Sequence, residues 1–204
     1  MPLSPEEIQQ PRTPQELLAF VESVRERAKT DDELRTAGHL RRGYLKEFFD
    51  EIVPLAKFAA AVYPESCKVS PVLGNQGFDA EVHDAEGRLL ERVEIANPID
   101  GSARASIGRE LAESGIGGLR VGDPGDDFEE LIPIIERTAS KKALKDYSDA
   151  VVVFNVSACP AFKGFEARQE EQAERVRSTL SSMGFRAKRV FIMFPSGGVD
   201  RVDA

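Results

Sequence analysis

Two short apolar runs near the C-terminus constrain the fold more than any other feature of the chain. Residues 149–156 (DAVVVFNV) and 189–194 (RVFIMF) are almost uninterrupted apolar stretches. Such runs are typical of strands that are buried on both faces of a sheet. A polar segment of helical length, about residues 165–183, separates them. This strand–helix–strand order predicts two parallel strands joined by a right-handed crossover.

The N-terminal part of the chain has the periodicity of helices. Residues 13–16 (TPQE) predict an N-cap with proline at the first helical position and glutamate at N3, and an apolar stripe follows to about residue 29. We expect the first ten or so residues, which contain several prolines, to form a loose tail. A second helix from about Asp31 breaks near Gly38 and Gly43.

That helix resumes at Tyr44 and has a strong apolar period to Ala59, with Pro54 as a predicted kink. Beyond it we expect a short edge strand at residues 68–73, a helix near 103–113 and a long helix at about 127–147. The sequence therefore predicts an α/β (α+β) fold with a mixed central β-sheet flanked by helices. Residues 1–43 would form an N-terminal tail and helical extension, and residues 44–204 the main domain.

A β-hairpin at about residues 77–96 carries the most informative pattern. Phe78, Ala80 and Val82 alternate with polar residues, and so do Val93 and Ile95 on the return strand. Because side chains alternate between the two faces of a strand, the apolar set faces the core. The polar residues of both strands then share the opposite face, and they are Asp79, Glu81, Arg92 and Glu94.

The length of the turn decides which of these polar residues are opposite one another. A two-residue turn at residues 86–87 places Asp79 opposite Glu94, with Cβ atoms about 5 Å apart. A four-residue turn at residues 84–87 places Asp79 opposite Arg92 and diagonal to Glu94, at about 7–8 Å. A three-residue turn with a glycine bulge would spoil the match.

Two carboxylates on adjacent strands repel each other, and a divalent cation removes that conflict. Oxygen ligands suit Mg²⁺ or Mn²⁺, which are typically held by one or two carboxylates, waters and a substrate phosphate. The alternative is an exposed polar face with Arg92 as counter-ion.

The motifs GFDAEV and VEIAN, which carry Asp79 and Glu94, resemble the core of the PD-(D/E)xK nucleases, a restriction-endonuclease-like superfamily. The segment KKALKDYSDAVVVFNV is similar to the helix and strand that follow the catalytic hairpin in that superfamily. The resemblance covers about residues 44–195. It implies a metal site formed by Asp79, Glu94 and the carbonyl oxygen of Ile95.

One position departs from the pattern of the superfamily, because Ala96 stands where its lysine is expected. In some branches the lysine lies on a nearby helix, and here the resemblance nominates Lys142 first, Lys141 second, and also Lys145. In some branches an acid of the first helix joins the metal site, which nominates Glu51 or Glu47.

Two functions follow from the resemblance. The first is a nuclease-like phosphodiesterase that requires Mg²⁺ or Mn²⁺ and acts on nucleic acid. The second is a catalytically inactive protein of the same fold that serves as a binding or regulatory module, with a homodimer or a protein partner engaged through the N-terminal helices. The net charge of −8 argues against a general nucleic-acid coat but not against an enzyme that binds nucleic acid locally.

The remaining expectations concern location. No apolar run approaches the ~18 residues that would cross a bilayer, so no membrane partner is expected. The N-terminal sequence lacks the basic and apolar regions of a secretory signal, and Cys67 and Cys159 have no CxxC spacing. We therefore expect a cytoplasmic protein with two buried, reduced thiols.

Overall fold

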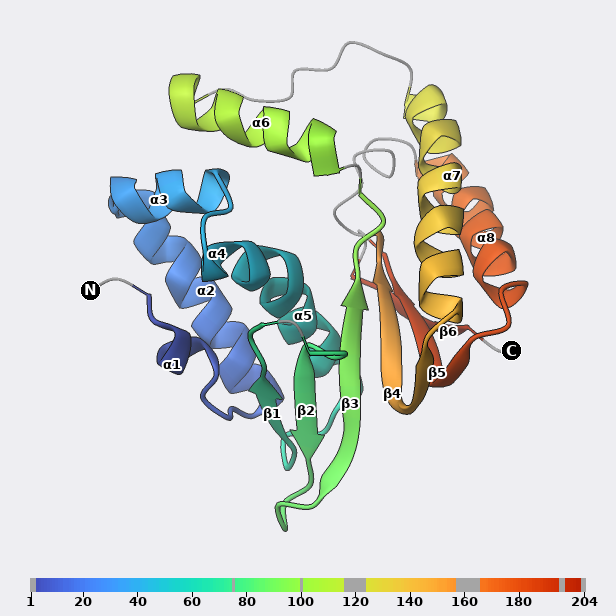
Figure 1. Cartoon of the computed structure of the whole chain (residues 1–204), viewed down its shortest axis with the longest axis horizontal. Coiled ribbons are helices and arrows are strands. Elements are labelled where there is room, and N and C mark those ends of the chain that lie inside the picture. The colour runs from blue at the N-terminus through green and yellow to red at the C-terminus, as the bar shows by residue number, and fades with distance from the viewer. Residues whose placement is uncertain are drawn as a thin grey trace. The chain divides into compact units, whose positions relative to one another are not determined.

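Strand β3 (Leu89–Ala96) contributes residues to both of the units into which the chain folds (Figure 1). In the computed structural model, unit 1 comprises Met1–Glu94 and Ser102–Leu119, and unit 2 comprises Ile95–Gly101 and Arg120–Ala204. The structure describes residues 3–74, 76–99, 101–115, 124–156, 166–194 and 197–202. The division differs from the predicted one, because residues 1–43 belong to the same unit as the hairpin.

Unit 1 combines helices with antiparallel strands. Its helical elements are α1 (Pro5–Ile8), α2 (Pro14–Thr30), α3 (Asp32–His39), α4 (Tyr44–Glu47), the π-helix η1 (Phe48–Ile52), α5 (Val53–Val62) and α6 (Gly101–Ser114), which begins at the boundary of the unit. Its strands are β1 (Lys68–Pro71), β2 (Ala80–His83) and the larger part of β3. Strand β2 pairs antiparallel with both β1 and β3.

The chain begins with a short ordered helix, so the prediction of a loose tail is wrong for the described residues. The Ser4 side chain accepts a hydrogen bond from the Glu7 N–H at 3.1 Å and caps α1, whose first residue is Pro5. Leu3 and Ile8 are buried. Burial of these two apolar side chains, together with the cap, holds a segment that its prolines alone would leave extended.

Helix α2 follows the predicted capping box. The Thr13 hydroxyl accepts from the Glu16 N–H at 3.3 Å, and the Glu16 carboxylate accepts from the Thr13 N–H at 2.8 Å. Leu17, Val21 and Val24 are fully buried along one face of the helix. The predicted start and the predicted apolar stripe of this helix are both confirmed.

The irregularity predicted near Pro54 takes the form of the π-helix η1. Pro54 has no N–H to donate to the carbonyl oxygen four residues earlier, so the α-helical ladder is interrupted there. The N–H of the preceding residue, Val53, instead reaches back five residues to the carbonyl oxygen of Phe48. This wider turn sets the positions of Asp50 and Glu51, the two acids of η1.

Unit 2 contains the two apolar runs as neighbouring strands. Its elements are helices α7 (Pro124–Ala143) and α8 (Glu166–Ser181) and strands β4 (Asp146–Asn155), β5 (Arg186–Met193) and β6 (Val199–Val202). Strands β4 and β5 are parallel, as predicted, and β6 pairs antiparallel with β5. Parallel and antiparallel pairs flanked by helices confirm the predicted mixed α/β class.

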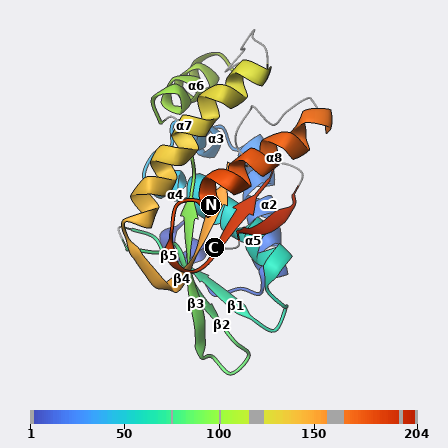
Figure 2. The same cartoon turned by 90° about the vertical axis from the view of Figure 1, so that its right-hand side faces the viewer.

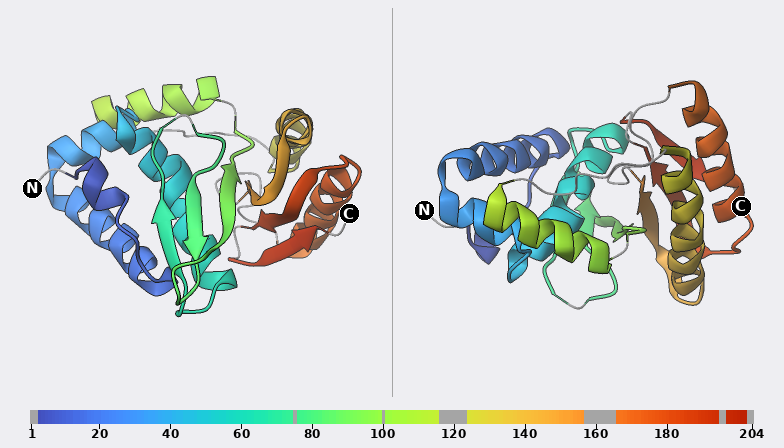
Figure 3. Two further views of the ribbon diagram at one scale, coloured as in Figure 1. Left: turned by 60° about the horizontal axis from the view of Figure 1, so that its bottom comes forward. Right: turned by 90° about the horizontal axis from the view of Figure 1, so that it is seen from above.

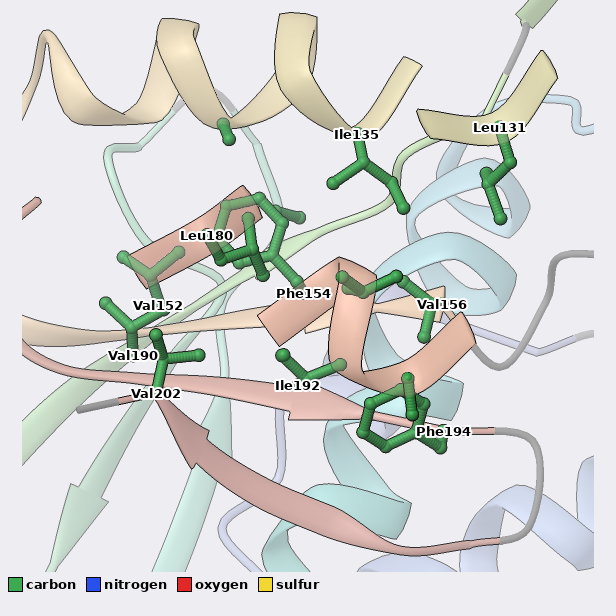
Figure 4. Close-up of a cluster of buried hydrophobic side chains, with 14 of the residues drawn as sticks. Leu131, Ile135, Val152, Phe154, Val156, Leu180, Val190, Ile192, Phe194 and Val202 are labelled. Atoms are coloured by element: carbon green, nitrogen blue, oxygen red, sulfur yellow. The ribbon is translucent and has the colours of Figure 1, made fainter. Parts of the chain in front are cut away.

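The hydrophobic core of unit 2 lies between its strands and its two helices. Helices α7 and α8 lie side by side on one face of these strands (Figure 2). Ile135 of α7 and Leu180 of α8 point toward Val152, Phe154 and Ile192 of the strands (Figure 4). All five side chains are fully buried.

Two features of unit 2 differ from the prediction: the end of α7 and the presence of β6. Helix α7 ends at Ala143, and Tyr147, which was expected in the helix, pairs with Ala187 in the sheet and is 3% exposed. An aromatic residue in a half-buried position favours a strand, and tertiary packing overrides the helical pattern here. Strand β6 was not predicted, because it is short and only two of its four residues are apolar.

Cys67 is buried and free, as predicted, whereas Cys159 lies outside the described residues. Among the described helices, none combines the length and the apolar character that crossing a membrane requires.

Candidate carboxylate site

Asp79 lies directly before β2, where its backbone is held between two strands. Its N–H donates to the carbonyl oxygen of Val93 at 2.7 Å, and its own carbonyl oxygen accepts from the Val72 N–H at 2.9 Å. The strand register pairs Ala80 with Val93, and its continuation would place Asp79 opposite Glu94. The Asp79 N–H bonds instead to the carbonyl oxygen of Val93, one residue short of that continuation, so the ladder is irregular at Asp79.

The hairpin has a three-residue turn, yet the polar face survives. Asp84 donates its N–H to the carbonyl oxygen of Arg88 at 3.0 Å, and Gly87 adopts a φ of 80° that favours glycine. A second irregularity follows, because Val82 pairs with Glu91 but His83 pairs with Leu89. The extra residue in β3 cancels the shift that the turn introduces. The pairs nearer to Asp79 therefore have the register of the predicted two-residue turn.

Arg92 serves as a counter-ion on the polar face. Its Nε lies 3.4 Å from the Glu81 carboxylate, directly across the strands, and its guanidinium lies over the Phe78 ring at 4.5 Å. His83 Nε2 lies 3.9 Å from the same carboxylate. Glu81 is thus an ion-paired residue of the hairpin, and its negative charge is already balanced by Arg92.

Glu51 is the acid of η1 whose electrostatic environment includes Asp79. Its pKa is raised from 4.5 to about 8, first because burial disfavours the charged form and then because Asp79 and Glu47 add negative charge. The fold thus brings an acid from η1 to an acid 28 positions later in the chain. A buried carboxyl group that keeps its proton near neutral pH and senses a second acid suits a cation, which would replace that proton.

The neighbouring acid in η1, Asp50, has a different environment. Its Oδ1 lies 3.3 Å from Nη1 of Arg41 and 2.9 Å from Nη2 of Arg104. Its side chain is 15% exposed. Two guanidinium groups hold this carboxylate, and sequence reasoning missed the arrangement because its members come from three separate elements.

Glu91 was also missed. It is 4% exposed and lies on the apolar face of β3, where its carboxylate accepts a hydrogen bond from the Tyr63 hydroxyl at 2.6 Å. The alternation along β3 contained the signal, because Glu91 is two residues before the buried Val93 and lies opposite Val82, so it falls on the core side.

The other hairpin residues of the predicted metal site are buried at the end of β3. Glu94 is 7% exposed and Ile95 is 5% exposed. Ala96, which stands at the position of the expected lysine, belongs to the hydrophobic core of unit 2. Asn97 accepts a hydrogen bond from the Asn155 side-chain amide at 2.8 Å, so it has a structural role within that unit.

The nominated lysines lie at or after the C-terminal end of α7, in unit 2. Lys142 Nζ lies 5.9 Å from the centre of the Tyr147 ring, and Lys141 is exposed. Lys145 follows the helix and is also exposed. Their pairing with the carboxylates of unit 1 stays a prediction.

The residues present suit a cation that needs few protein ligands. No group of three or more histidine, cysteine, aspartate or glutamate side chains gathers as a metal site within the described ranges. Glu51 and Asp79 form a pair, and Mg²⁺ commonly uses one or two carboxylates and completes its shell with water or phosphate. The burial of Glu51 and the negative charge of Asp79 and Glu47, which together raise its pKa, are the observations that fit a cation here.

Comparisons of the chain with family models, with curated proteins and with solved structures returned no match. The resemblance to the PD-(D/E)xK nucleases therefore stays a prediction from the motifs.

Proposed function

We propose that the protein is a phosphodiesterase of the PD-(D/E)xK type that requires a divalent cation, Mg²⁺ or Mn²⁺, and acts on nucleic acid. The observation that carries the proposal is the raised pKa of Glu51, about 8, which is caused first by burial of the carboxyl group and then by the negative charge of Asp79 and Glu47. A second carboxylate close to the hairpin acid is what the resemblance nominates for a metal site.

Each acid of the site would have a definite part. Asp79 is fixed by its backbone bonds to Val72, which follows β1, and to Val93 of β3, so its carboxylate is presented from a rigid position. Glu51 approaches from η1 and would give up its proton when it binds the cation. Glu94 and the carbonyl oxygen of Ile95 would complete the set from β3. A bound Mg²⁺ or Mn²⁺ would supply an activated water and neutralise charge on the phosphodiester.

A helix lysine would replace the one missing at position 96. An ammonium near the scissile phosphate stabilises the charge that develops in the transition state. Lys142 is our first choice and Lys141 the second, in keeping with the resemblance. Substitution of each by methionine removes the charge and retains most of the length of the side chain, so it tests this part separately.

A cleavage assay tests the proposal. Purified protein is incubated with plasmid, single-stranded DNA and RNA in Mg²⁺ or Mn²⁺, and the Asp79→Asn, Glu94→Gln and Glu51→Gln variants are compared with it. Glu86→Gln is the matched control, because Glu86 lies in the exposed turn of the same hairpin. We expect cleavage that needs the cation, falls at least a hundredfold in the Asp79 and Glu94 variants and persists in the control. Cleavage unchanged in those two variants, or absent on all substrates, would contradict the proposal.

A second candidate function rests on Ala96. Its methyl group lies in a hydrophobic core at 2% exposure, in the position where the superfamily has its lysine. This favours a catalytically inactive module that retains the acids but has lost the chemistry. Calorimetric titration with Mg²⁺ and Mn²⁺ distinguishes the two: cation binding without cleavage on any substrate supports the inactive module.

A further inference from the structure

A pocket of about 300 Å³ lies within unit 1, among α2, α3, η1 and α6. Helix α6 lies beside α3 (Figures 1 and 3). The cationic residues that line the pocket are Arg25, Arg35, Arg41 and Arg104, with His39 beside them. Among the described residues, no aspartate or glutamate lines it, although the chain as a whole has a net charge of −8. The pocket is therefore a local concentration of positive charge on an acidic protein.

Acids outside the pocket neutralise this charge only in part. Arg25 and Arg35 contact acids one turn earlier on their own helices, Glu22 at 2.7 Å and Asp32 at 2.6 Å. The side chains of those two acids are 51% and 83% exposed, so water screens both pairs strongly. Arg25 and Arg35 thus keep much of their capacity to bind an anion.

The deeper pair, Arg41 and Arg104, shares the single carboxylate of Asp50. Nη1 of Arg41 is buried, and among the described residues it has no hydrogen-bond acceptor in suitable geometry, since its 3.3 Å contact with Asp50 is ionic only. A buried guanidinium N–H without an acceptor is costly, and an anion in the pocket would supply one.

The wall of the pocket is shaped by close packing. Arg41 has a φ of 50°, unusual for a residue other than glycine, and its guanidinium lies over the Phe49 ring at 4.8 Å. A Cβ on Gly108 of α6 would come within 2.4 Å of the His39 carbonyl oxygen, so only glycine allows α6 to approach α3 this closely. The arginines are thus presented from a preformed surface rather than from mobile side chains alone.

The pocket also has an apolar part. The Phe49 ring, Ile107 and Leu111 line it together with the arginines. A ligand that satisfies both parts carries a compact anion attached to a flat, weakly polar group. The volume of the pocket suits a ligand of the size of a mononucleotide.

We infer that this pocket binds a terminal phosphomonoester, with the phosphate on Arg35, Arg41 and Arg104 and a nucleobase against Phe49 and Leu111. The inference goes beyond the proposed function, because it needs neither a cation nor cleavage. The same chemistry occurs in a free nucleotide and at the phosphorylated end of a nucleic-acid strand, and the experiment separates these two sources.

Isothermal titration at constant ionic strength tests the inference without added metal. The probes are adenosine monophosphate, adenosine, and one oligonucleotide with and without a terminal phosphate. We expect adenosine monophosphate to bind at least tenfold more tightly than adenosine. A further preference for the phosphorylated oligonucleotide over the free nucleotide identifies the strand end as the source, and the reverse preference identifies the nucleotide.

Variants then place the binding in the pocket. Arg35→Gln combined with Arg104→Gln should weaken binding of adenosine monophosphate at least tenfold. Arg25→Gln serves as a milder variant if the double variant fails to fold. Arg27→Gln is the matched control on α2, because Arg27 pairs with Glu7 and does not line the pocket. Equal binding of adenosine and its monophosphate, or binding unaffected by the pocket variants, would overturn the inference.

Discussion

Asp50 and Glu51 are neighbours in the same π-helix and have opposite environments. Asp50 lies against two guanidinium groups, at 3.3 Å and 2.9 Å. Glu51 faces Asp79 and Glu47, and burial with these like charges raises its pKa to about 8. The two acids are adjacent in the sequence, and the elements packed around each one decide that the first is a structural anion and the second a candidate ligand.

The difference teaches how a cation site can be recognised in a protein without bound metal. A buried acid that has a cationic partner contributes to stability and has little to gain from a metal. In a partly buried acid that is close to another acid, the ionised form is destabilised by burial and by like charge. A divalent cation would remove that destabilisation. The following changes test this contrast, beginning with the largest expected effect.

Removal of the Asp50 carboxylate should produce the largest loss of stability. Asp50→Ala leaves Arg41 and Arg104 facing each other in a half-buried site, and we expect the free energy of unfolding to fall by about 2–3 kcal/mol. Urea denaturation monitored by circular dichroism measures the change. Asp32→Ala is the control, since Asp32 forms a mostly exposed ion pair within α3. Equal losses of stability in Asp50→Ala and Asp32→Ala would contradict the claim that the buried ion pairs of Asp50 matter more than an exposed one.

Glu91 is a second buried acid with a partner, and the hydrogen bond from Tyr63 should contribute less than two guanidinium groups do. Tyr63→Phe removes the donor to the Glu91 carboxylate, and we expect a loss of about 1–2 kcal/mol in urea denaturation. The double variant Tyr63→Phe, Glu91→Leu should recover much of that loss, because the buried carboxylate that lost the Tyr63 donor is itself removed. A double variant less stable than Tyr63→Phe would contradict this account.

Glu51→Gln should have an effect of the opposite sign, and one that depends on pH. Between about pH 4.5 and pH 8 the folded protein retains the proton of Glu51 while the unfolded chain loses it, so the contribution of Glu51 to stability falls as pH rises through this range. Glutamine does not titrate. The variant should therefore gain stability relative to wild type between pH 5 and pH 9.

Urea denaturation of both proteins at the two pH values measures this gain, with Glu86→Gln as the control from the exposed turn. A difference between Glu51→Gln and wild type that stays constant with pH would show that Glu51 is ordinarily ionised in the folded protein.

The smallest effect is expected for an acid at the surface. Glu129 of α7 contacts Arg175 of α8 through both carboxylate oxygens, and its side chain is 64% exposed. Solvent and salt screen such a pair. Glu129→Gln should leave the melting temperature essentially unchanged in a thermal denaturation scan. A shift as large as that of Asp50→Ala would mean that burial does not separate these acids.

Much of the fold could be predicted because local patterns determine it. The apolar runs that hold Val152 and Ile192 form the parallel pair β4 and β5, and the alternation around Ala80 and Val82 forms the hairpin. The capping box at Thr13 sets the start of α2. In each case the period of the apolar residues or the chemistry of a cap lies within a few positions of the chain.

Less of the candidate site could be predicted, because its members come from distant parts of the chain. Asp79 was recognised from the hairpin and Glu51 from the family resemblance, but nothing local shows that burial places them together. The bulge at Leu90, which restores the register, has no signature in the residues around it. The convergence of Arg41 and Arg104 on Asp50 depends on how α6 packs within unit 1.

The most direct test of the central claim, that Glu51 and Asp79 form a cation site, is calorimetric titration of the protein with Mn²⁺ and Mg²⁺ at pH 6 and pH 8. Because Glu51 loses its proton near pH 8, we predict tighter binding at pH 8 than at pH 6 and loss of binding in both Asp79→Asn and Glu51→Gln, with Glu86→Gln unaffected. No binding by the wild-type protein, or binding that survives both substitutions, would contradict the account.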